Sequence, residues 1–328
     1  MRKILTLSRV AAVCALSVLT VACGSDDSTS DNTDNGDAAG ATTAADTSSN
    51  GELPTIVVTT NILGDIVTQA VGDLAEVEVV MPVGADPHDF APSARQAESM
   101  ENADLLVTNG AGFEEGMREV IEQVESSGTP VFSFADQVEL IEFSGEEHIG
   151  DDPHIWNDPS RMITAVEAFG VEFASLGGVD AAAVEAQVQS YVDELTALDA
   201  EMEDTLSTIP AEQRVLVTNH VVFGYFADHF SFEVVGAVIP SSTTNAEPST
   251  AEVEALVALI EQEQIPAIFA DTSSHSRLAG AIASSASGDV QVVALYSESL
   301  GEPGSGADSY LTMMATNATL IADALIPA

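Results

Sequence analysis

Two of the six histidines of this chain lie in the same short motif, and histidine is a common ligand of metal ions. Asp-Pro-His occurs at residues 86–88 and again at residues 152–154, so that a proline immediately precedes both His88 and His154. Proline fixes φ and removes a backbone donor, which suits an imidazole held by a stiff loop. An ordinary turn uses the same residues, so the motif alone leaves both interpretations open.

Three further side chains lie at or just beyond the carboxyl ends of predicted strands. His220 follows its strand by two residues, Asp271 ends another strand, and Glu298 comes just after a third. In open parallel sheets, ligands bind beyond the carboxyl ends of the strands. Two lobes that face each other through these edges would bring these three candidates together with His88 and His154.

The remaining three histidines are weaker candidates for ligands. His229 lies nine residues after His220 on the same predicted helix, so the two side chains face opposite ways. His275 lies at a serine-rich helix start, and His148 lies in an acidic loop. We expect all three outside the site.

The elements that must position these residues alternate between strand and helix. β-branched and apolar runs predict strands at 55–60, 77–82, 104–109, 130–135, 214–218, 233–240, 266–270 and 290–295. Helical spacing predicts helices at 61–71, from Ser93, from Phe113, after Asn157, and at 220–230, 250–264, near Arg277 and 310–325. This order favours an α/β fold with two doubly wound parallel-sheet lobes.

A longer helix separates the two series. An apolar stripe runs from about Asp180, a plausible N-cap, to Leu206, which predicts a helix roughly 40 Å long. The stripe consists of Val184, Val188, Tyr191, Leu195, Leu198, Met202 and Leu206. We therefore expect an N-terminal lobe at 53–179, a connecting helix at 180–208 and a C-terminal lobe at 209–328.

The first 52 residues do not read as part of either lobe. Residues 1–22 carry three basic residues followed by an apolar run, which is typical of a secretory signal and too short for a membrane span. LTVACGS resembles a bacterial lipobox, which implies cleavage before Cys23 and lipid on its sulfur; a plain signal peptide with a free cysteine is the alternative. Residues 24–52 are almost entirely small or acidic, so residues 23–52 are predicted to be a disordered, lipid-anchored linker.

The composition excludes some classes of partner. All 53 acidic residues follow residue 22, whereas only five arginines and no lysine do. Such a charge disfavours binding to nucleic acid or to anionic lipid through a basic patch, and it favours the attraction of cations. The only other cysteine, Cys14, lies in the predicted signal, so the mature chain has no disulfide and no thiolate metal site.

Four stretches together carry a resemblance to a known family. They are ADPHDFAPS (85–93), DPHIWNDP (152–159), TNHVVFGYFADHF (218–230) and LYSESLGEPGSGADSYLTMMATN (295–317). In this order they resemble the zinc/manganese class of ABC-transporter solute-binding lipoproteins, most closely its zinc-binding branch. A further stretch, NGAGFEEGM (109–117), is similar to another segment of that family, and the likeness covers most of residues 53–328.

The resemblance implies two α/β lobes joined by a long rigid helix, with one metal ion in the cleft between them. Carried over by motif, the ligands are His88, His154, His220 and Glu298. The family usually has Asp where Glu298 stands, and the extra methylene moves the carboxylate. Asp271 is therefore the alternative fourth ligand.

The resemblance also implies a function without catalysis. We expect a monomeric lipoprotein, on the cell surface or in the periplasm, that captures Zn(II) and delivers it to an ABC permease for import. Three imidazoles and one carboxylate suit tetrahedral Zn²⁺, whereas a site for Mn(II) is expected to use more oxygen. Groups near Asp86, Asp89 and Asp158 are candidates to orient the rings, with surface or capping roles as the alternative.

Two other functional classes remain open at this stage. A zinc hydrolase would use the three histidines as ligands and Glu298 as general base on a bound water. A receptor for an organic ligand would need a cleft lined by aromatic residues or arginine. The chain is only 5% aromatic and its five mature arginines are scattered, which argues against that receptor.

Overall fold

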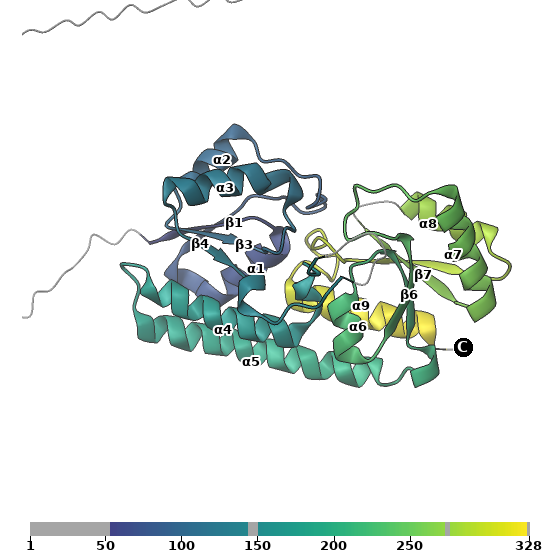
Figure 1. The fold of residues 1–328 in the computed structure, drawn as a ribbon. Coiled ribbons are helices and arrows are strands. Elements are labelled where there is room, and N and C mark those ends of the chain that lie inside the picture. Colours follow the sequence, from purple (N-terminus) through teal and green to yellow (C-terminus); the bar gives the residue numbers. More distant parts are fainter. Residues whose placement is uncertain (1–52, 144–149, 273–275, 327–328) are drawn as a thin grey trace, which may run out of the picture. The chain divides into compact units, whose positions relative to one another are not determined.

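The computed structural model describes residues 53–143, 150–272 and 276–326. The strands of these residues form two parallel four-stranded sheets (Figure 1). The first sheet has the order β2-β1-β3-β4, with β1 at Thr55–Val58, β2 at Glu76–Val79, β3 at Leu105–Thr108 and β4 at Val131–Ser133. The second has the order β6-β5-β7-β8, with β5 at Val215–His220, β6 at Glu233–Ile239, β7 at Ala267–Asp271 and β8 at Gln291–Leu295.

Helices cover both faces of the first sheet. They are α1 (Asn61–Val71), α2 (Ala94–Glu101), α3 (Arg118–Ser127) and α4 (Pro159–Ser175). Alternate residues of a strand point to opposite faces, and β1 follows this rule. Ile56 and Val58 pack with the core that contains α1 and α4, whereas Val57 packs with Met100 and Val124 of α2 and α3. Burial on both faces explains why the two central strands, β1 and β3, are mostly apolar, whereas the edge strand β2 alternates glutamate with valine.

The second sheet is built in the same way. Its helices are α6 (Gly224–Phe230), α7 (Thr250–Glu263), α8 (Ser276–Ser285) and α9 (Tyr310–Leu325). Val217 and Ile268 pack with α7 and α8, while Leu216 and Phe269 face the core that contains α6 and α9. The structure thus confirms the predicted α/β class with two parallel-sheet lobes.

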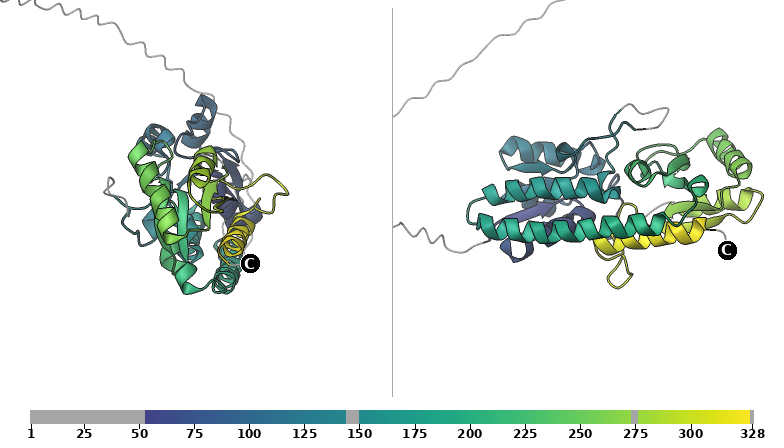
Figure 2. Two further views of the ribbon diagram at one scale, coloured as in Figure 1. Left: turned by 90° about the vertical axis from the view of Figure 1, so that its right-hand side faces the viewer. Right: turned by 90° about the horizontal axis from the view of Figure 1, so that it is seen from below.

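Helix α5, at Ala181–Leu206, runs along both lobes (Figures 1 and 2). Asp180 caps it, as predicted, by accepting hydrogen bonds from the N–H groups of Ala182 and Ala183. Every residue of the predicted stripe is buried, and the helix contacts α1, α4 and α9. One hydrophobic cluster therefore extends from β1 through α5 to α9, so the two lobes share a continuous core.

Some predicted elements begin or end elsewhere. The helix expected from Phe113 begins at Arg118, after a 3-10 turn at Glu115–Met117. The helix expected from His220 begins at Gly224, because strand β5 continues to His220 and pairs there with Ile239. His220 therefore lies at the end of a strand and not on the helix that carries His229. Within the described residues, none of the helices is both long and apolar enough to cross a membrane.

Candidate metal centre

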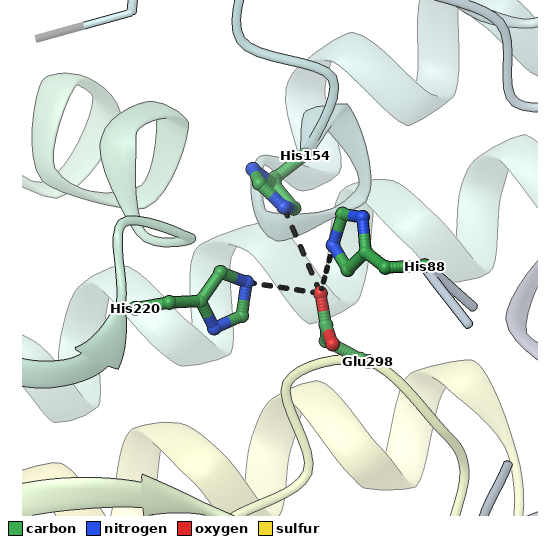
Figure 3. Close-up of side chains that lie close together, drawn as sticks. All are labelled: His88, His154, His220 and Glu298. Atoms are coloured by element: carbon green, nitrogen blue, oxygen red, sulfur yellow. Dashed lines mark hydrogen bonds and ion pairs between the residues drawn. The ribbon is translucent and has the colours of Figure 1, made fainter. Parts of the chain in front are cut away.

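The four predicted ligands lie together, and three imidazoles point at one carboxylate oxygen (Figure 3). Oε1 of Glu298 is 3.0 Å from Nε2 of His88, 3.0 Å from Nε2 of His220 and 3.7 Å from Nε2 of His154. One candidate ligand atom from each of the four residues lies within 4.8 Å of the other three. The first lobe supplies His88 and His154, and the second supplies His220 and Glu298.

All four side chains are buried, each with an exposed fraction of 2% or less. Within the described residues, Nε2 of His154 and Nε2 of His220 lie near Oε1 of Glu298 but form no hydrogen bond of good geometry, and Oε2 of Glu298 has no hydrogen-bond partner. Buried polar atoms without partners are rare, since each loses its hydration without compensation. Atoms of this kind that converge on one point suit the coordination of a cation by nitrogen and oxygen.

The charges of the group are strongly coupled. Burial opposes protonation of His88, but the negative charge of Glu298 and hydrogen bonds to Glu115 and Glu298 raise its pKa to about 10. Burial likewise opposes ionisation of Glu298, yet the charges of His220 and His88 hold its pKa well below the usual range. A positive charge is therefore favoured beside Glu298, and either protons or a metal ion can supply it.

Both Asp-Pro-His triplets form the same local turn. Oδ1 of Asp86 accepts the backbone N–H of His88 at 3.0 Å, and Oδ1 of Asp152 accepts that of His154 at 3.0 Å. In the second triplet the same Asp152 oxygen lies 2.7 Å from Nδ1 of His154. The turn thus fixes the backbone in both triplets, and it fixes the imidazole directly in the second. Burial opposes protonation of His154, but Asp152 raises its pKa.

A different carboxylate fixes the ring of His88. Oε1 of Glu115 lies 3.1 Å from Nδ1 of His88. The preceding Glu114 is buried and accepts hydrogen bonds from the hydroxyl of Thr59 and the N–H of Asn109, at 2.8 Å and 2.6 Å. Glu114 therefore anchors the loop that presents Glu115. A carboxylate at Nδ1 holds the proton there and leaves Nε2 for a metal.

The loop that carries Glu298 is held from several sides. Asp271, at the end of β7, accepts hydrogen bonds from both the N–H and the hydroxyl of Ser297. Asp271 is not among the four residues whose ligand atoms converge; it instead fixes the residue before Glu298. The carbonyl of Ser297 also accepts a hydrogen bond from the indole of Trp156. The structure therefore brings Glu298, and not Asp271, to the three histidines.

The other residues considered from the sequence lie elsewhere. His229 is partly buried beside Asp199, with Nε2 2.7 Å from Oδ1, and is not in the group. Asp158 caps α4 and pairs with Arg161, and Asp89 is exposed, so neither orients an imidazole of the candidate metal centre. His148, His275 and Cys23 lie outside the described residues. Glu115 and Asp152 were not predicted from the sequence as partners of the rings, although Asp152, two residues before His154, was a visible signal.

The two parallel-sheet lobes together supply imidazoles and a carboxylate to one buried group. This arrangement indicates a protein of the metal-receptor class, and the comparisons with known proteins agree. A family model described as "Zinc-uptake complex component A periplasmic" matches residues 56–324. The chain belongs to this family of substrate-binding proteins of metal ABC transporters, which work with permease components. The family consists of receptors and not of enzymes, which rules out the hydrolase alternative.

Individual relatives cover nearly the same part of the chain. Zinc-binding protein TroA of Treponema pallidum is 30% identical over 276 residues, 83% of this chain and 89% of the relative. Manganese-binding lipoprotein MntA of Halalkalibacterium halodurans is 27% identical over 271 residues, 83% of this chain and 88% of the relative. The names of the relatives thus include both metals.

Solved structures support the fold. The structure of the periplasmic zinc-binding protein TroA from Treponema pallidum has a TM-score of 0.78 at 29% identity and covers 84% of this chain and 100% of that one. A manganese-bound periplasmic metal-binding protein from Candidatus Liberibacter asiaticus has a TM-score of 0.73 at 21% identity, over 83% of this chain and 100% of that one. At that identity the second likeness concerns the fold alone.

Proposed function

We propose that this protein captures Zn²⁺ at His88, His154, His220 and Glu298 and delivers it to an ABC permease for import. The observation that carries the proposal is the convergence of three Nε2 atoms on one oxygen of Glu298, with all four side chains buried. Three nitrogens and one oxygen form the donor set that tetrahedral Zn²⁺ favours. Four protein ligands leave no open position for a reacting water, which suits storage of the ion as cargo.

The N-terminal sequence and the names of the relatives support a proposal for the location. Relatives of this chain are named lipoproteins, and LTVACGS resembles a lipobox. We infer an exported, monomeric protein that is anchored to a membrane by lipid on Cys23, with residues 24–52 as its tether. Incorporation of labelled fatty acid into the expressed chain, and its loss in Cys23→Ser, tests the anchor.

Mn²⁺ is the second candidate ion, and one observation favours it. Oε2 of Glu298 is buried and has no hydrogen-bond partner within the described residues, so it is available as a second oxygen ligand. Mn²⁺ prefers oxygen and higher coordination numbers, and relatives of this chain are named for manganese. Against it, nitrogen-rich sites bind Zn²⁺ far more tightly than Mn²⁺.

A competitive titration of the metal-stripped chain decides between the ions. We expect one tightly held Zn²⁺ per chain that Mn²⁺ does not displace, and we expect His154→Ala to lose it. Preference for Mn²⁺ would keep the receptor and change its cargo. No stoichiometric binding of either ion, with His154→Ala unchanged, would overturn the site itself. The ring of His154 is fully buried, so His154→Ala removes a candidate ligand from inside the site and does not change the surface.

A further inference from the structure

A polar segment of the second lobe lies against the segment that carries His88. It comprises residues 241–247, which begin two residues after the end of β6 at Ile239, and we call it the clasp. The hydroxyl of Thr244 donates to Oδ2 of Asp86 at 2.7 Å. The side-chain amide of Asn245 donates to the carbonyl of His88 at 3.2 Å and faces Oε2 of Glu115 at 3.5 Å. The clasp therefore connects the second lobe to the first beside the candidate metal centre.

The carboxylates of Asp86 and Glu115 each contact His88 with one oxygen and the clasp with the other. Asp86 uses Oδ1 for the backbone N–H of His88 and Oδ2 for the hydroxyl of Thr244. Glu115 uses Oε1 for Nδ1 of His88 and Oε2 for the amide of Asn245. Each carboxylate is thus a bridge between His88 and the clasp. No residue of the clasp belongs to the group of candidate ligands.

His88 depends on the other lobe in a way that the other two histidines do not. The ring of His154 is held by the carboxylate of Asp152, which makes no hydrogen bond to the second lobe within the described residues, although the hydroxyl of Tyr225 donates to the backbone carbonyl of Asp152. His220 is held as the last residue of strand β5. His88 lies in a loop, and Figure 3 shows its ring and the ring of His220 approaching Glu298 from different sides. The carboxylates of Asp86 and Glu115, which hold His88, also accept hydrogen bonds from residues of the second lobe. Loss of the clasp therefore loosens His88 before the other imidazoles.

The shared core limits other routes of release. One hydrophobic cluster extends through both lobes, and α5 contacts helices of each. Separation of the lobes as rigid bodies would expose part of this core to water, which is costly. The clasp contacts, in contrast, are a few hydrogen bonds of loop residues, and loops supply the motions of lowest free energy.

We propose that residues 241–247 act as a clasp that sets the rate of metal release, with Thr244 and Asn245 as positioning residues for His88 through Asp86 and Glu115. The inference rests on the proposed function, because it assigns a role at the same site. Opening of the clasp frees the His88 loop while His154, His220 and Glu298 keep their places. The ion then loses one ligand first, which is the step that a partner can promote by competing for the clasp.

The test compares release of Zn²⁺ from the full-length protein to an excess of a chromogenic chelator. The variants are Thr244→Val, which keeps the shape and removes the hydroxyl, Asn245→Ala, and the double variant. Ser242→Ala is the matched control, because Ser242 lies in the clasp and makes no hydrogen bond within the described residues. Thr244→Ser is the rescue variant, since it restores the donor to Asp86. Stoichiometry of bound Zn²⁺ and the midpoint of urea unfolding are measured for each.

We expect the double variant to bind one Zn²⁺ and to release it about tenfold faster or more, because hydrogen bonds to carboxylates are among the stronger ones. Ser242→Ala and Thr244→Ser should keep the wild-type rate. An unchanged release rate in the double variant, with wild-type stoichiometry, would overturn the clasp and leave the metal receptor standing. Equally fast release from Thr244→Ser and Thr244→Val would also overturn it, because a missing donor would then not be the cause. Failure of the wild-type chain to bind Zn²⁺ would overturn the proposed function instead.

Discussion

The indole N–H of Trp156 donates a hydrogen bond to the carbonyl of Ser297, the residue before Glu298, at 2.9 Å. The same indole lies against the ring of His154, with the ring centroids 5.4 Å apart. Its own carbonyl accepts a hydrogen bond from the hydroxyl of Tyr310 at 2.7 Å. Trp156, the only tryptophan of the chain, thus joins the segment of His154 in one lobe to the segment of Glu298 in the other.

Replacement of Trp156 by Phe should weaken metal binding without removing a ligand. The buried carbonyl of Ser297 then loses this donor, and the Glu298 loop loses one of its restraints. We expect one Zn²⁺ per chain with about tenfold lower affinity, as for other residues that orient ligands. Competitive titration with a chelator of known affinity measures this. Phe132→Leu, a core change away from the group, controls for general loss of stability and should leave the affinity unchanged.

Glu298→Gln tests the fourth ligand while it keeps the size of the side chain. The variant removes the negative charge at which the three imidazoles point, so we expect the Zn²⁺ affinity to fall by more than the ~10–100-fold typical of an orienting residue. Glu302→Gln, an exposed acid in the same loop, is the control and should behave as wild type. If both variants bind Zn²⁺ like the wild type, Glu298 is not a ligand.

Topology was sufficient to predict that His88, His154, His220, Asp271 and Glu298 lie close together, whereas the choice of four of them as ligands came from the resemblance to the family. Parallel strands end at one edge of a sheet, so residues just beyond those ends meet even when they are far apart in sequence. Spacing could not decide between Asp271 and Glu298, because both lie at strand ends. Their roles depend on where the Ser297 loop turns, and that is fixed by Trp156 from the other lobe, a contact that no local pattern contains.

The contacts around the rings were harder to predict for a similar reason. Asp86 and Asp152 occupy equivalent positions in their triplets, yet only Asp152 reaches the ring of its histidine. The ring of His88 is held by Glu115, which is 27 residues away in sequence. The end of β5 was also missed, because its last two residues, Asn219 and His220, are polar and the apolar residues that follow fit the start of a helix. Pairing with Ile239 extends the strand there.

Metal capture should weaken as the pH falls. Each imidazole must be deprotonated at the nitrogen that binds the ion, so protons and Zn²⁺ compete for the same atoms. We expect the apparent Zn²⁺ affinity to rise from about pH 5 and to keep rising above about pH 8, since the pKa of His88 is raised to about 10 and the pKa of His154 is raised as well. Competitive titrations at several pH values measure the slope, and His154→Ala should show a shallower one. A pH-independent affinity would contradict coordination by imidazole.

His229 should make a pH-dependent contribution to folding that is separate from the metal centre. Its Nε2 lies 2.7 Å from Asp199 and its Nδ1 3.8 Å from Asp158. The hydrogen bond to Asp199 raises the pKa of His229, although burial and the charge of Arg161 oppose the shift. A raised pKa means that the folded state binds the proton more tightly than the unfolded state does. The stabilisation is therefore complete below the unfolded pKa of about 6.5 and disappears as the pH rises through the higher folded value.

Urea unfolding of the metal-free wild type and of His229→Asn, at several pH values, measures this contribution. The pair is partly exposed, so we expect the variant to be less stable by about 1 kcal/mol or less near pH 6. The difference should shrink towards pH 9, because the imidazolium is then lost in both the folded and the unfolded state. A difference that stays constant with pH would mean that His229 contributes through packing alone. A difference that grows with pH would mean that its folded pKa is lowered, which the contact with Asp199 contradicts.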